Sequence, residues 1–596
     1  MALNLVANRQ HRIDYFSPMP RIDRLGREQA QLFKPSSGLP LSLAIVPLAG
    51  ASRQSGTDLL TRNSSVATSS IGRALVTLGM LALAGCAVGP DFTAPSVKVA
   101  DSWLEWRGKA IRTDETGHAG WWRAFRDPTL DQLIDIASQQ NLTLLAAGTR
   151  VMQARAELGV AVGELYPQQQ QLAGNTIYNV ASHATPASTS ATAPRRFWTD
   201  AVGFQAGWEI DFWGKFRRGV ESADAAYLAS IASYDDVLVS LLGDVASTYI
   251  GIRTLQREIA IAQENVVRQR EAVRITRARF QEKATSQLDV FQAENVLGAT
   301  EAAVPQLTIQ LKQGLNALRV LLGMAPEPLN TLLGRGRGIP VAPASIAVGI
   351  PADLLRRRPE IRAAELRAAA QSAQIGVAQA ELYPAISITG SFGGSASNAS
   401  GHRLVQALHP IGRAAMIGPS FQWNILNYGQ ITNNVRLQDA TLQEYLTNYQ
   451  QSVLKAQQEV ENAIALYTLS RSQAAALQRS VAAARGALRL AMLEYQQGTR
   501  DFTTVLTAQQ NVYQAEINLT GALANISLGA VSLYRGLGGG WQIREGRGFV
   551  DEATAAEMRA RTNWGDLLTP AGDTQPQTPG LPGTEDRGPT VRAPDW

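Results

Sequence analysis

Apolar and polar residues alternate with a period of two in four segments of the chain, and this pattern predicts β-strands. In 202–212 the even positions are apolar, and in 417–425 the odd positions are apolar. Residues 386–392 alternate in the same way, whereas 168–180 begins with four glutamines and is ambiguous. Strands of roughly ten residues with one apolar face, one polar face and terminal aromatic residues are typical of transmembrane β-barrels.

The polar face of these strands indicates what they enclose. Glu209 and Asp211 stand beside glycines on this face and favour a water-filled lumen. The alternative is an ordinary amphipathic sheet that covers a soluble core. The polar loops at about 181–197 and 394–414 contain three histidines that we expect to be exposed rather than to bind a metal: His183, His402 and His409.

Two very long stretches, about 215–281 and 430–497, are rich in Ala, Gln and Arg and predict helices. At 1.5 Å per residue each reaches roughly 100 Å, which exceeds a single globular core. Such helices must therefore pack against one another as a coiled coil or a helical barrel. Shorter helices are expected to return over 287–322 and 502–537, the first with a kink at Pro305.

The chain contains an internal duplication. The run Glu164-Leu165-Tyr166-Pro167 recurs as Glu381-Leu382-Tyr383-Pro384, at an offset of 217. Trp208 recurs as Trp423 at an offset of 215, so a slip of two positions falls between Pro167 and Trp208. Two homologous halves are therefore predicted, each with a short helix, a strand pair, a long helix and a return helix. The short helices are expected at about 129–164 and 359–381, each ended by a proline.

The net charge lies outside this predicted fold. The chain of 596 residues has 55 Lys and Arg against 50 Asp and Glu, a formal charge of +5. Residues 1–85 contain nine of these basic residues and four of the acidic ones, which leaves 46 of each in the rest of the chain. The basic excess therefore does not support a nucleic-acid partner.

Residues 73–86 have the pattern of a lipoprotein signal. Arg73 precedes an apolar run of roughly a dozen residues, which is too short to span a membrane as a helix. The run ends in Leu83-Ala84-Gly85-Cys86, which matches a bacterial lipoprotein processing box. We therefore expect Cys86, the single cysteine, to carry a covalent lipid, and Ala87 after it favours the outer membrane. The alternative is a buried helix that ends at an inert cysteine.

Four strands cannot close a membrane barrel alone, because unpaired strand edges are too costly in lipid and single-chain bacterial barrels begin at about eight strands. The chain must therefore oligomerise. The expected fold class is a mixed α and β membrane protein, in which a trimeric 12-stranded β-barrel with four strands per chain continues into a long periplasmic α-helical barrel. No phosphate-binding loop or inner-membrane helix is found in the sequence, which favours a passive exit duct.

Residues 86–95, 121–130 and 353–364 carry three further motifs. Together they closely resemble the TolC-like outer-membrane factor family, and its lipoprotein branch, which serves efflux pumps of the resistance-nodulation-division type. The resemblance runs from Cys86 to about Trp541. It implies a homotrimer anchored by lipid in the cell outer membrane and extending into the periplasm, with no enzymatic activity and no cofactor. It also implies a periplasmic adaptor and an inner-membrane transporter of that type as partners, with drugs, toxins or metabolites as cargo.

The residues and the resemblance together suggest how the chain is divided. Residues 1–72 are far too long for a signal n-region, and an upstream extension from a miscalled start and a disordered leader both remain open. The expected parts are an N-terminal extension at 1–72 that is absent from the mature protein, a signal peptide at 73–85, an N-terminal mature segment at 86–128, a first repeat at 129–323, an equatorial linker at 324–352, a second repeat at 353–538, a C-terminal equatorial segment at 539–565 and a disordered tail at 566–596.

In that family the turns at the periplasmic end form a constriction. The resemblance assigns four candidate gate residues to the beginning of the two return helices: Asp289, Gln292, Thr504 and Thr507. Thr507 stands where relatives often have an acid, and Asp501 is a hypothetical replacement for that acid. Asp289 equally suits a helix N-terminal acid favoured by the helix dipole. The candidate adaptor contacts lie in the turns, for which plain solvated turns are the alternative: Thr285, Ser286, Gly498, Thr499 and Arg500.

Other functions remain open at this point. One alternative is the outer-membrane duct of another export system. A periplasmic adaptor lipoprotein is a second alternative, although it would carry one helical hairpin rather than a duplication. An enzyme is disfavoured because no Ser/His/Asp or metal-binding constellation is found. The single cysteine also excludes a disulfide framework and zinc sites built on several cysteines.

Overall fold

The computed structural model describes residues 87–104, 110–112, 118–182, 194–334, 338–349, 351–352 and 357–568. All of them lie within one structural unit, Val76–Trp596. The predicted N-terminal extension, signal peptide, lipidated Cys86 and His183 lie outside the described residues. The predicted tail lies outside them as well, apart from its first three residues, which belong to the short turn η6 (Gly565–Leu568).

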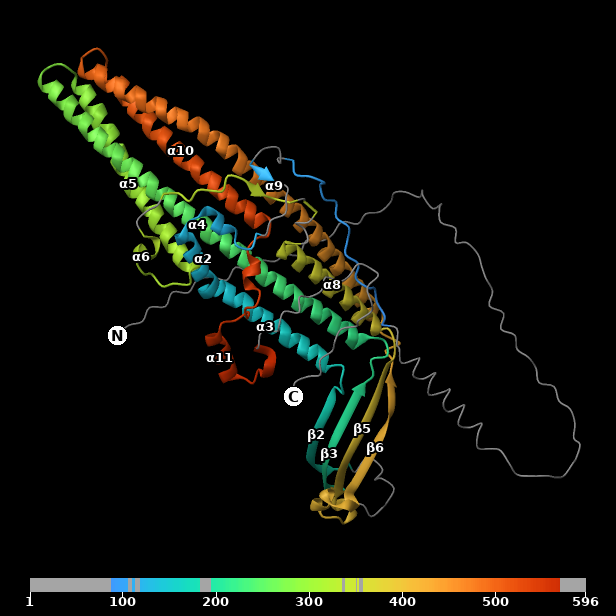
Figure 1. Cartoon of the computed structure of the whole chain (residues 1–596). Helices are drawn as coiled ribbons and strands as arrows, with labels where there is room; N and C mark the ends of the chain where they lie inside the picture. The colour runs from blue at the N-terminus through green and yellow to red at the C-terminus, as the bar shows by residue number, and fades with distance from the viewer. Residues whose placement is uncertain are drawn as a thin grey trace, which may run out of the picture. The chain divides into compact units, whose positions relative to one another are not determined.

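Four strands form one antiparallel sheet in the order β2-β3-β5-β6 (Figure 1). They span Gln169–Val180, Arg196–Glu209, Ala385–Ser397 and Arg413–Gln422. The four predicted strands are confirmed, including the ambiguous one at 168–180. Among the described residues β2 pairs only with β3 and β6 pairs only with β5, so the described sheet has two unpaired edges.

The hydrogen-bond register locates the slip between the two halves. Gln169 pairs with Gly207 in the first hairpin, and Ala385 pairs with Gln422 in the second. Gly207 and Gln422 keep the offset of 215, so Gln169 and Ala385 are equivalent at an offset of 216. One position of the slip therefore lies between Pro167 and β2, and the other lies in the loop between β2 and β3.

The long helices α4 (Lys215–Gln281) and α9 (Gln430–Gln496) have 67 residues each. The return helices α5 (Gln287–Leu321) and α10 (Phe502–Gly536) have 35 residues each, and Pro305 does not end the first of them. Each return helix packs along its long partner, as Figure 1 shows. The equal lengths confirm that the halves share one architecture.

The predicted helix at 129–164 is in fact two helices, and this prediction was wrong in one respect. α2 (Pro128–Gln140) ends at Asn141, and α3 (Leu142–Gly163) begins directly after it. Asn141 takes an extended conformation, and its side-chain oxygen accepts a hydrogen bond from the Leu144 N–H at 2.8 Å. This N-cap breaks the Ala-rich pattern. The matching helix of the second half, α8 (Pro359–Ala380), has 22 residues like α3.

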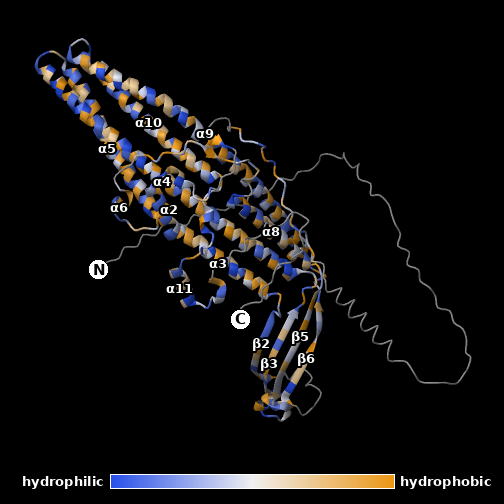
Figure 2. Cartoon of the chain, viewed as in Figure 1, coloured by the Kyte–Doolittle hydropathy of each residue, from blue (hydrophilic) through white to orange (hydrophobic). Residues whose placement is uncertain are grey.

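Apolar residues are spread along the whole length of the long helices (Figure 2). The main buried core joins α2, α3, α4 and α10, with Trp121 stacked on Tyr534 at 5.4 Å between ring centroids. A second, smaller core lies where α4, α5, α9 and α10 approach their turns. The remaining elements are short: β1 (Ile111–Arg112), η1 (Trp121–Phe125), α6 (Asn330–Leu333), β4 (Ile346–Ala347), η2 (Asn398–Ser400), η3 (Leu404–Leu408), η4 (Pro410–Gly412), η5 (Trp541–Arg544) and α11 (Glu552–Arg561).

Candidate functional site

The two faces of the sheet differ in chemistry. Strand register places a row of large apolar side chains on one face: Leu172, Tyr178, Trp198, Phe204, Trp208, Ile388, Phe392, Ile417 and Phe421. The other face carries mainly amides, hydroxyls and small residues: Gln171, Asn175, Gln205, Glu209, Ser387, Thr389, Ser391 and Ser420. Trp198 and Trp208 are ten residues apart on β3, which corresponds to ~25 Å across the membrane for a tilted strand. The sheet therefore has a lipid face of membrane height and a wet face.

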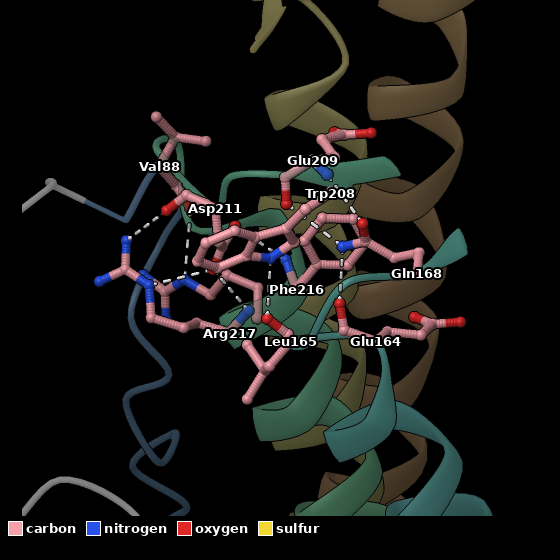
Figure 3. A network of polar contacts seen from close by, with 10 residues as sticks. Val88, Glu164, Leu165, Gln168, Trp208, Glu209, Asp211, Phe216 and Arg217 are labelled. Carbon is pink, nitrogen blue, oxygen red and sulfur yellow. Dashed lines mark hydrogen bonds and ion pairs between the residues drawn. The ribbon is translucent and has the colours of Figure 1, made fainter. Parts of the chain in front are cut away.

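Both halves join strand to helix through the same hydrogen bond. Trp208 donates its indole N–H to the Leu165 carbonyl at 3.2 Å, and Trp423 donates to the Leu382 carbonyl at 3.0 Å. In the first half, the Gln168 side-chain amide also donates its N–H to the Glu209 carbonyl and accepts from the Glu209 N–H (Figure 3). The repeated Glu-Leu-Tyr-Pro run thus ends a helix and offers a carbonyl to the tryptophan at the end of the strand.

Asp211 does not face the lumen, which corrects the expectation from the alternating pattern. β3 ends at Glu209, and the Asp211 carboxylate accepts hydrogen bonds from the Phe216 and Arg217 N–H groups at 3.0 and 2.9 Å (Figure 3). It also pairs with the Arg217 side chain at 3.1 Å. Asp211 is therefore an N-terminal cap of α4, where the free N–H groups and the helix dipole favour a carboxylate.

The segment directly after Cys86 is held at this same junction. The Val88 N–H donates to the Trp213 carbonyl at 3.0 Å, and buried Arg218 pairs with Asp91 at 2.6 Å. A side chain at Gly376 would place its Cβ 2.7 Å from the Val88 carbonyl oxygen, so the contact requires glycine. The chain next to the predicted lipid anchor is thus clamped where the membrane sheet meets the helices.

The connection between α4 and α5 holds Asp289, a predicted gate acid, in a helix cap. Ser286 is the N-cap of α5, and it forms a reciprocal capping box with Asp289. The Asp289 carboxylate also accepts a hydrogen bond from the Thr285 hydroxyl. The predicted residues Thr285, Ser286 and Asp289 are therefore brought together, and Asp289 stabilises the beginning of the helix.

The connection between α9 and α10 has different hydrogen bonds. Thr499 bonds to the Glu494 carbonyl through both its N–H and its hydroxyl at 3.0 Å, and Arg500 pairs with the Glu494 carboxylate at 3.1 Å. Asp501 is the N-cap of α10 but makes no side-chain cap bond. Its exposed carboxylate is therefore less engaged than that of Asp289.

The other gate candidates lie further into the return helices. Thr507 donates its hydroxyl to the Thr503 carbonyl at 2.9 Å within its own helix, and the Thr504 N–H bonds to the Asp501 carbonyl. Gln292 has a buried side-chain oxygen that lacks a hydrogen-bond partner among the described residues. Thr504 and Thr507 line one cavity, whereas Gln292 lies on the other return helix.

Sequence reasoning missed the residue that joins the two turns. Arg279, near the end of α4, donates hydrogen bonds to the carbonyls of Tyr495 and Gln496 and lies over the Tyr495 ring, 4.6 Å from its centroid. Tyr495 in turn packs against Phe502 at 5.3 Å between centroids. A cation suits the negative end of α9. No local signal reveals this pairing, because 216 residues separate Arg279 from Tyr495.

Buried Arg358 explains the motif at 353–364. Its guanidinium donates to the carbonyls of Ala456 at 3.3 Å and Gly536 at 3.0 Å, and it pairs with Glu360 and with Glu459. It therefore joins the beginning of α8 to the middle of α9 and the end of α10. Residues 353–356 of the motif lie outside the described residues.

A wet face and a membrane-high lipid face on one sheet, continued by long paired helices, define a membrane-spanning conduit with a periplasmic extension. The sequence matches the family model of the outer membrane efflux protein over residues 133–324 and 350–539. The chain belongs to this family, which consists of transport channels. It is therefore an outer-membrane efflux channel.

Known proteins agree with this assignment. The chain is 31% identical to the pyoverdine export outer membrane protein OpmQ of Pseudomonas putida, over 71% of this chain and 88% of the relative. It is 29% identical to nodulation protein T of Rhizobium leguminosarum bv. trifolii, over 74% of this chain and 92% of the relative. Among solved structures, the outer-membrane channel OprN superposes with a TM-score of 0.70 at 32% identity, covering 77% of this chain and 100% of the other.

Proposed function

We propose that three copies of the chain form the outer-membrane duct of a tripartite efflux pump, closed as a shared barrel of 12 strands. The observation that carries this proposal is the open four-stranded sheet with unpaired edges at β2 and β6. Unpaired backbone groups are too costly in lipid, so each edge needs a partner strand. The polar face then lines the passage, and we infer that selection of cargo rests with the pump.

The internal duplication predicts how the strands meet at the seam between copies. Within the chain, β3 pairs with β5, the junction of the two halves. β6 is equivalent to β3 and β2 to β5, so β6 of one copy is expected to pair with β2 of the next in the same way. Carrying the register over by the offsets of 215 and 216 places Ile417 opposite Tyr178 and Ser420 opposite Asn175. In each pair the two residues lie on the same face of the sheet: Ile417 and Tyr178 face the lipid, and Ser420 and Asn175 face the lumen.

The helices supply the reach into the periplasm. Each long helix has 67 residues, or roughly 100 Å at 1.5 Å per residue. Their turns lie at the end of the helices opposite the sheet (Figure 1). We propose that these turns contact a periplasmic adaptor, through Thr285, Ser286, Gly498, Thr499 and Arg500, and that the adaptor links the duct to an inner-membrane transporter of the resistance-nodulation-division type.

The gate is proposed at the same end. Asp501 is exposed and makes no cap bond, so it is the acid best placed to face its copies in a trimer. Three like charges close to the axis repel one another and attract cations. Asp289 is less suited to this task because its capping box already engages it. Gln292, Thr504 and Thr507 remain candidates for the polar lining of the constriction.

Cys86 is proposed as the lipid anchor. Residues 87–91 are clamped at the periplasmic end of the sheet, so an acyl chain on the preceding residue would enter the near leaflet of the membrane. Globomycin, which blocks lipoprotein signal cleavage, is expected to leave a larger precursor. A Cys86→Ser protein that still fractionates fully with the outer membrane would remove the need for an anchor.

Relatives carry different cargo, and two of them are described as exporting pyoverdine and as pumping toluene. We infer that this chain passes a small molecule that its transporter selects. Deletion of the chain should raise cellular accumulation of a fluorescent pump substrate such as ethidium, and re-expression of the full chain should reverse it. Unchanged accumulation and drug tolerance across a broad panel would contradict an efflux role.

A further inference from the structure

Arginines follow the apolar side chains of the lipid face at the end of the sheet that lies away from the helices. On β3 the outward positions run from Trp208 to Trp198 and then reach Arg196. On β6, Arg413 pairs with Gly394, and both lie on the same outward face. Trp198 packs against Tyr178 at 4.9 Å between ring centroids just before this rim. Aromatic pairs of this kind mark the membrane–water interface, so Arg196 and Arg413 stand at headgroup level.

Residues 398–412, which we call the distal strap, fold back over this outward face. A Cβ at Gly394 would lie 1.7 Å from the Ala407 carbonyl oxygen, so the strap passes directly above the strand there. Ala396 of β5 and Ala407 of the strap are buried where the two meet, and Trp198 donates its backbone N–H to the Asn398 side chain at 2.8 Å. The strap is therefore packed on the lipid side of the sheet rather than over the lumen.

The outer side of the distal strap is apolar and uncovered. Val405, Leu408 and Ile411 are each 70% exposed. They extend the apolar surface of the strands towards the rim, and such a continuous exposed patch marks an interaction surface. The lipid face below the strap meets the bilayer, so the bilayer is the surface that these three side chains meet next.

The charge around the strap is mainly positive. The described distal residues, 180–182, 194–200 and 394–413, contain four arginines and one acid. The acid is Asp200, and residues 183–193 have neither Asp nor Glu in their sequence. Three of the arginines are exposed: Arg196, Arg403 and Arg413. By contrast, acids and bases are mixed at the periplasmic junction, where Asp211 pairs with Arg217.

We propose that the distal strap is an interfacial segment that binds phosphorylated lipid in the outer leaflet. Val405, Leu408 and Ile411 enter the acyl boundary, and Arg196, Arg403 and Arg413 bind the phosphate groups. Arginine suits this role because its planar fork pairs with phosphate through two hydrogen bonds. The inference rests on the proposed barrel closure, since only a closed barrel turns this face wholly to lipid.

The test uses the purified full-length trimer in detergent with diphosphoryl lipid A, and native mass spectrometry counts the lipid retained. The variant Arg403→Ser/Arg413→Ser is compared with the control Arg479→Ser/Arg489→Ser, which removes two exposed arginines of α9. Retention should fall about fivefold for each rim arginine lost and should not change in the control. Lipid A from which the phosphates have been removed should bind the unaltered protein more weakly than the diphosphoryl form binds the rim variant, because the variant retains Arg196.

The variant Leu408→Ser/Ile411→Ser gives a second arm, in which retention of both forms of the lipid should fall. Equal retention by the rim variant and the control, or equal binding of the lipid with and without phosphates, would overturn the inference. The same spectra report the mass of the assembly. A monomer in the unaltered protein would instead show that the barrel proposal has failed.

Discussion

Trp213 and Tyr428 occupy equivalent positions in the two halves, but their surroundings differ. Trp213 stacks on Tyr383 at 4.6 Å between centroids and donates its indole N–H to the Pro384 carbonyl at 2.9 Å. Tyr428 is 98% exposed. The second-half residues that Trp213 contacts, Tyr383 and Pro384, have Tyr166 and Pro167 as their equivalents in the first half. Tyr166 and Pro167 precede the edge strand β2, whereas Tyr428 follows the opposite edge strand β6.

The return helices repeat this difference. Arg270 pairs with Glu301 at 2.7 Å, and the equivalent Arg485 pairs with Glu516 at 2.6 Å. Glu301 is largely exposed, whereas Glu516 is buried and also lies 3.8 Å from Arg268 of α4. The first half covers Glu516, and nothing in the described part of the chain covers Glu301. The two differences together indicate that one junction between halves is complete within the chain and that the other needs a second copy.

The largest expected contrast is between Arg358 and its counterpart Asn141. Asn141 donates a hydrogen bond to the Leu321 carbonyl, and Arg358 donates one to the equivalent carbonyl of the second half, that of Gly536. Arg358 also forms ion pairs with two carboxylates. Arg358→Met should lower the free energy of unfolding by roughly 3–5 kcal/mol, because the buried carbonyls of Ala456 and Gly536 lose their donor and each such loss costs about 1–3 kcal/mol. Asn141→Ala should cost about 1–2 kcal/mol. Thermal unfolding of the two purified variants measures both, and equal losses would show that Arg358 is no more than a helix cap.

The ion pairs provide the next contrast. Glu516→Gln should destabilise the protein by about 1.5–3 kcal/mol, because a buried, charge-assisted hydrogen bond is weakened. Glu301→Gln should cost only about 0.2–1 kcal/mol, since an exposed pair is screened by water. The comparison is made by denaturant unfolding at low and high salt. The small cost of Glu301→Gln is expected for the separated chain, whereas in the trimer a second copy should cover Glu301 and bring the loss close to that of Glu516→Gln. A loss for Glu301→Gln that stays small in the trimer would contradict the seam.

The buried carboxyl group of Asp236 should make the stability of the protein depend on pH. Burial raises the pKa of this group from 3.8 to about 6, and the nearby Glu360 and Glu459 add to this effect against Arg358 and Arg367. The folded protein therefore holds the proton more strongly than the unfolded chain does, so stability falls as pH rises from about 4 to 6 and is level above that. Asp236→Asn should stabilise the protein by about 1–2 kcal/mol above pH 6. An unfolding temperature that keeps the same slope with pH in the variant would contradict this.

The two turns give the smallest contrast. Lys283 and Gly498 are equivalent and both adopt a positive φ, of 59° and 76°. Side chains are strained in this conformation, whereas glycine is not. Lys283→Gly should therefore stabilise the protein by up to about 1 kcal/mol, and Gly498→Ala should destabilise it by a similar amount. Opposite signs in calorimetry are expected, and a loss in both variants would show that the Lys283 side chain makes a contact of its own.

Much of the fold could be predicted from the sequence because its signals are periodic or repeated. Alternation marked three of the four strands and left 168–180 ambiguous, and the recurrence of Trp208 as Trp423 marked the duplication. The break at Asn141 was missed because an N-cap inside an Ala-rich stretch resembles any other polar residue. Asp211 was misplaced because apolar and polar residues continue to alternate after the strand hydrogen bonds end at Glu209.

The site was less accessible to sequence reasoning. Glycine and polar residues in the sequence indicated the two connections between the helices. Whether an acid caps a helix, as Asp289 does, or stays exposed, as Asp501 does, depends on the folded geometry. The contact between Arg279 and Tyr495 and the contacts of Arg358 join residues far apart in the chain. Only the folded arrangement brings such residues together.

The most direct test of the central claim, that copies of the chain meet as its two halves do, is disulfide cross-linking at the seam. The pair Ser420→Cys/Asn175→Cys places two lumen-facing cysteines opposite each other in the expected register, where Cβ atoms lie about 4.5–5.5 Å apart. Oxidation in isolated outer membranes should give a covalent trimer on denaturing gels. The control pair Ser420→Cys/Ala173→Cys, shifted by two positions, should remain largely monomeric. Efficient cross-linking of the shifted pair, or of neither, would contradict the account.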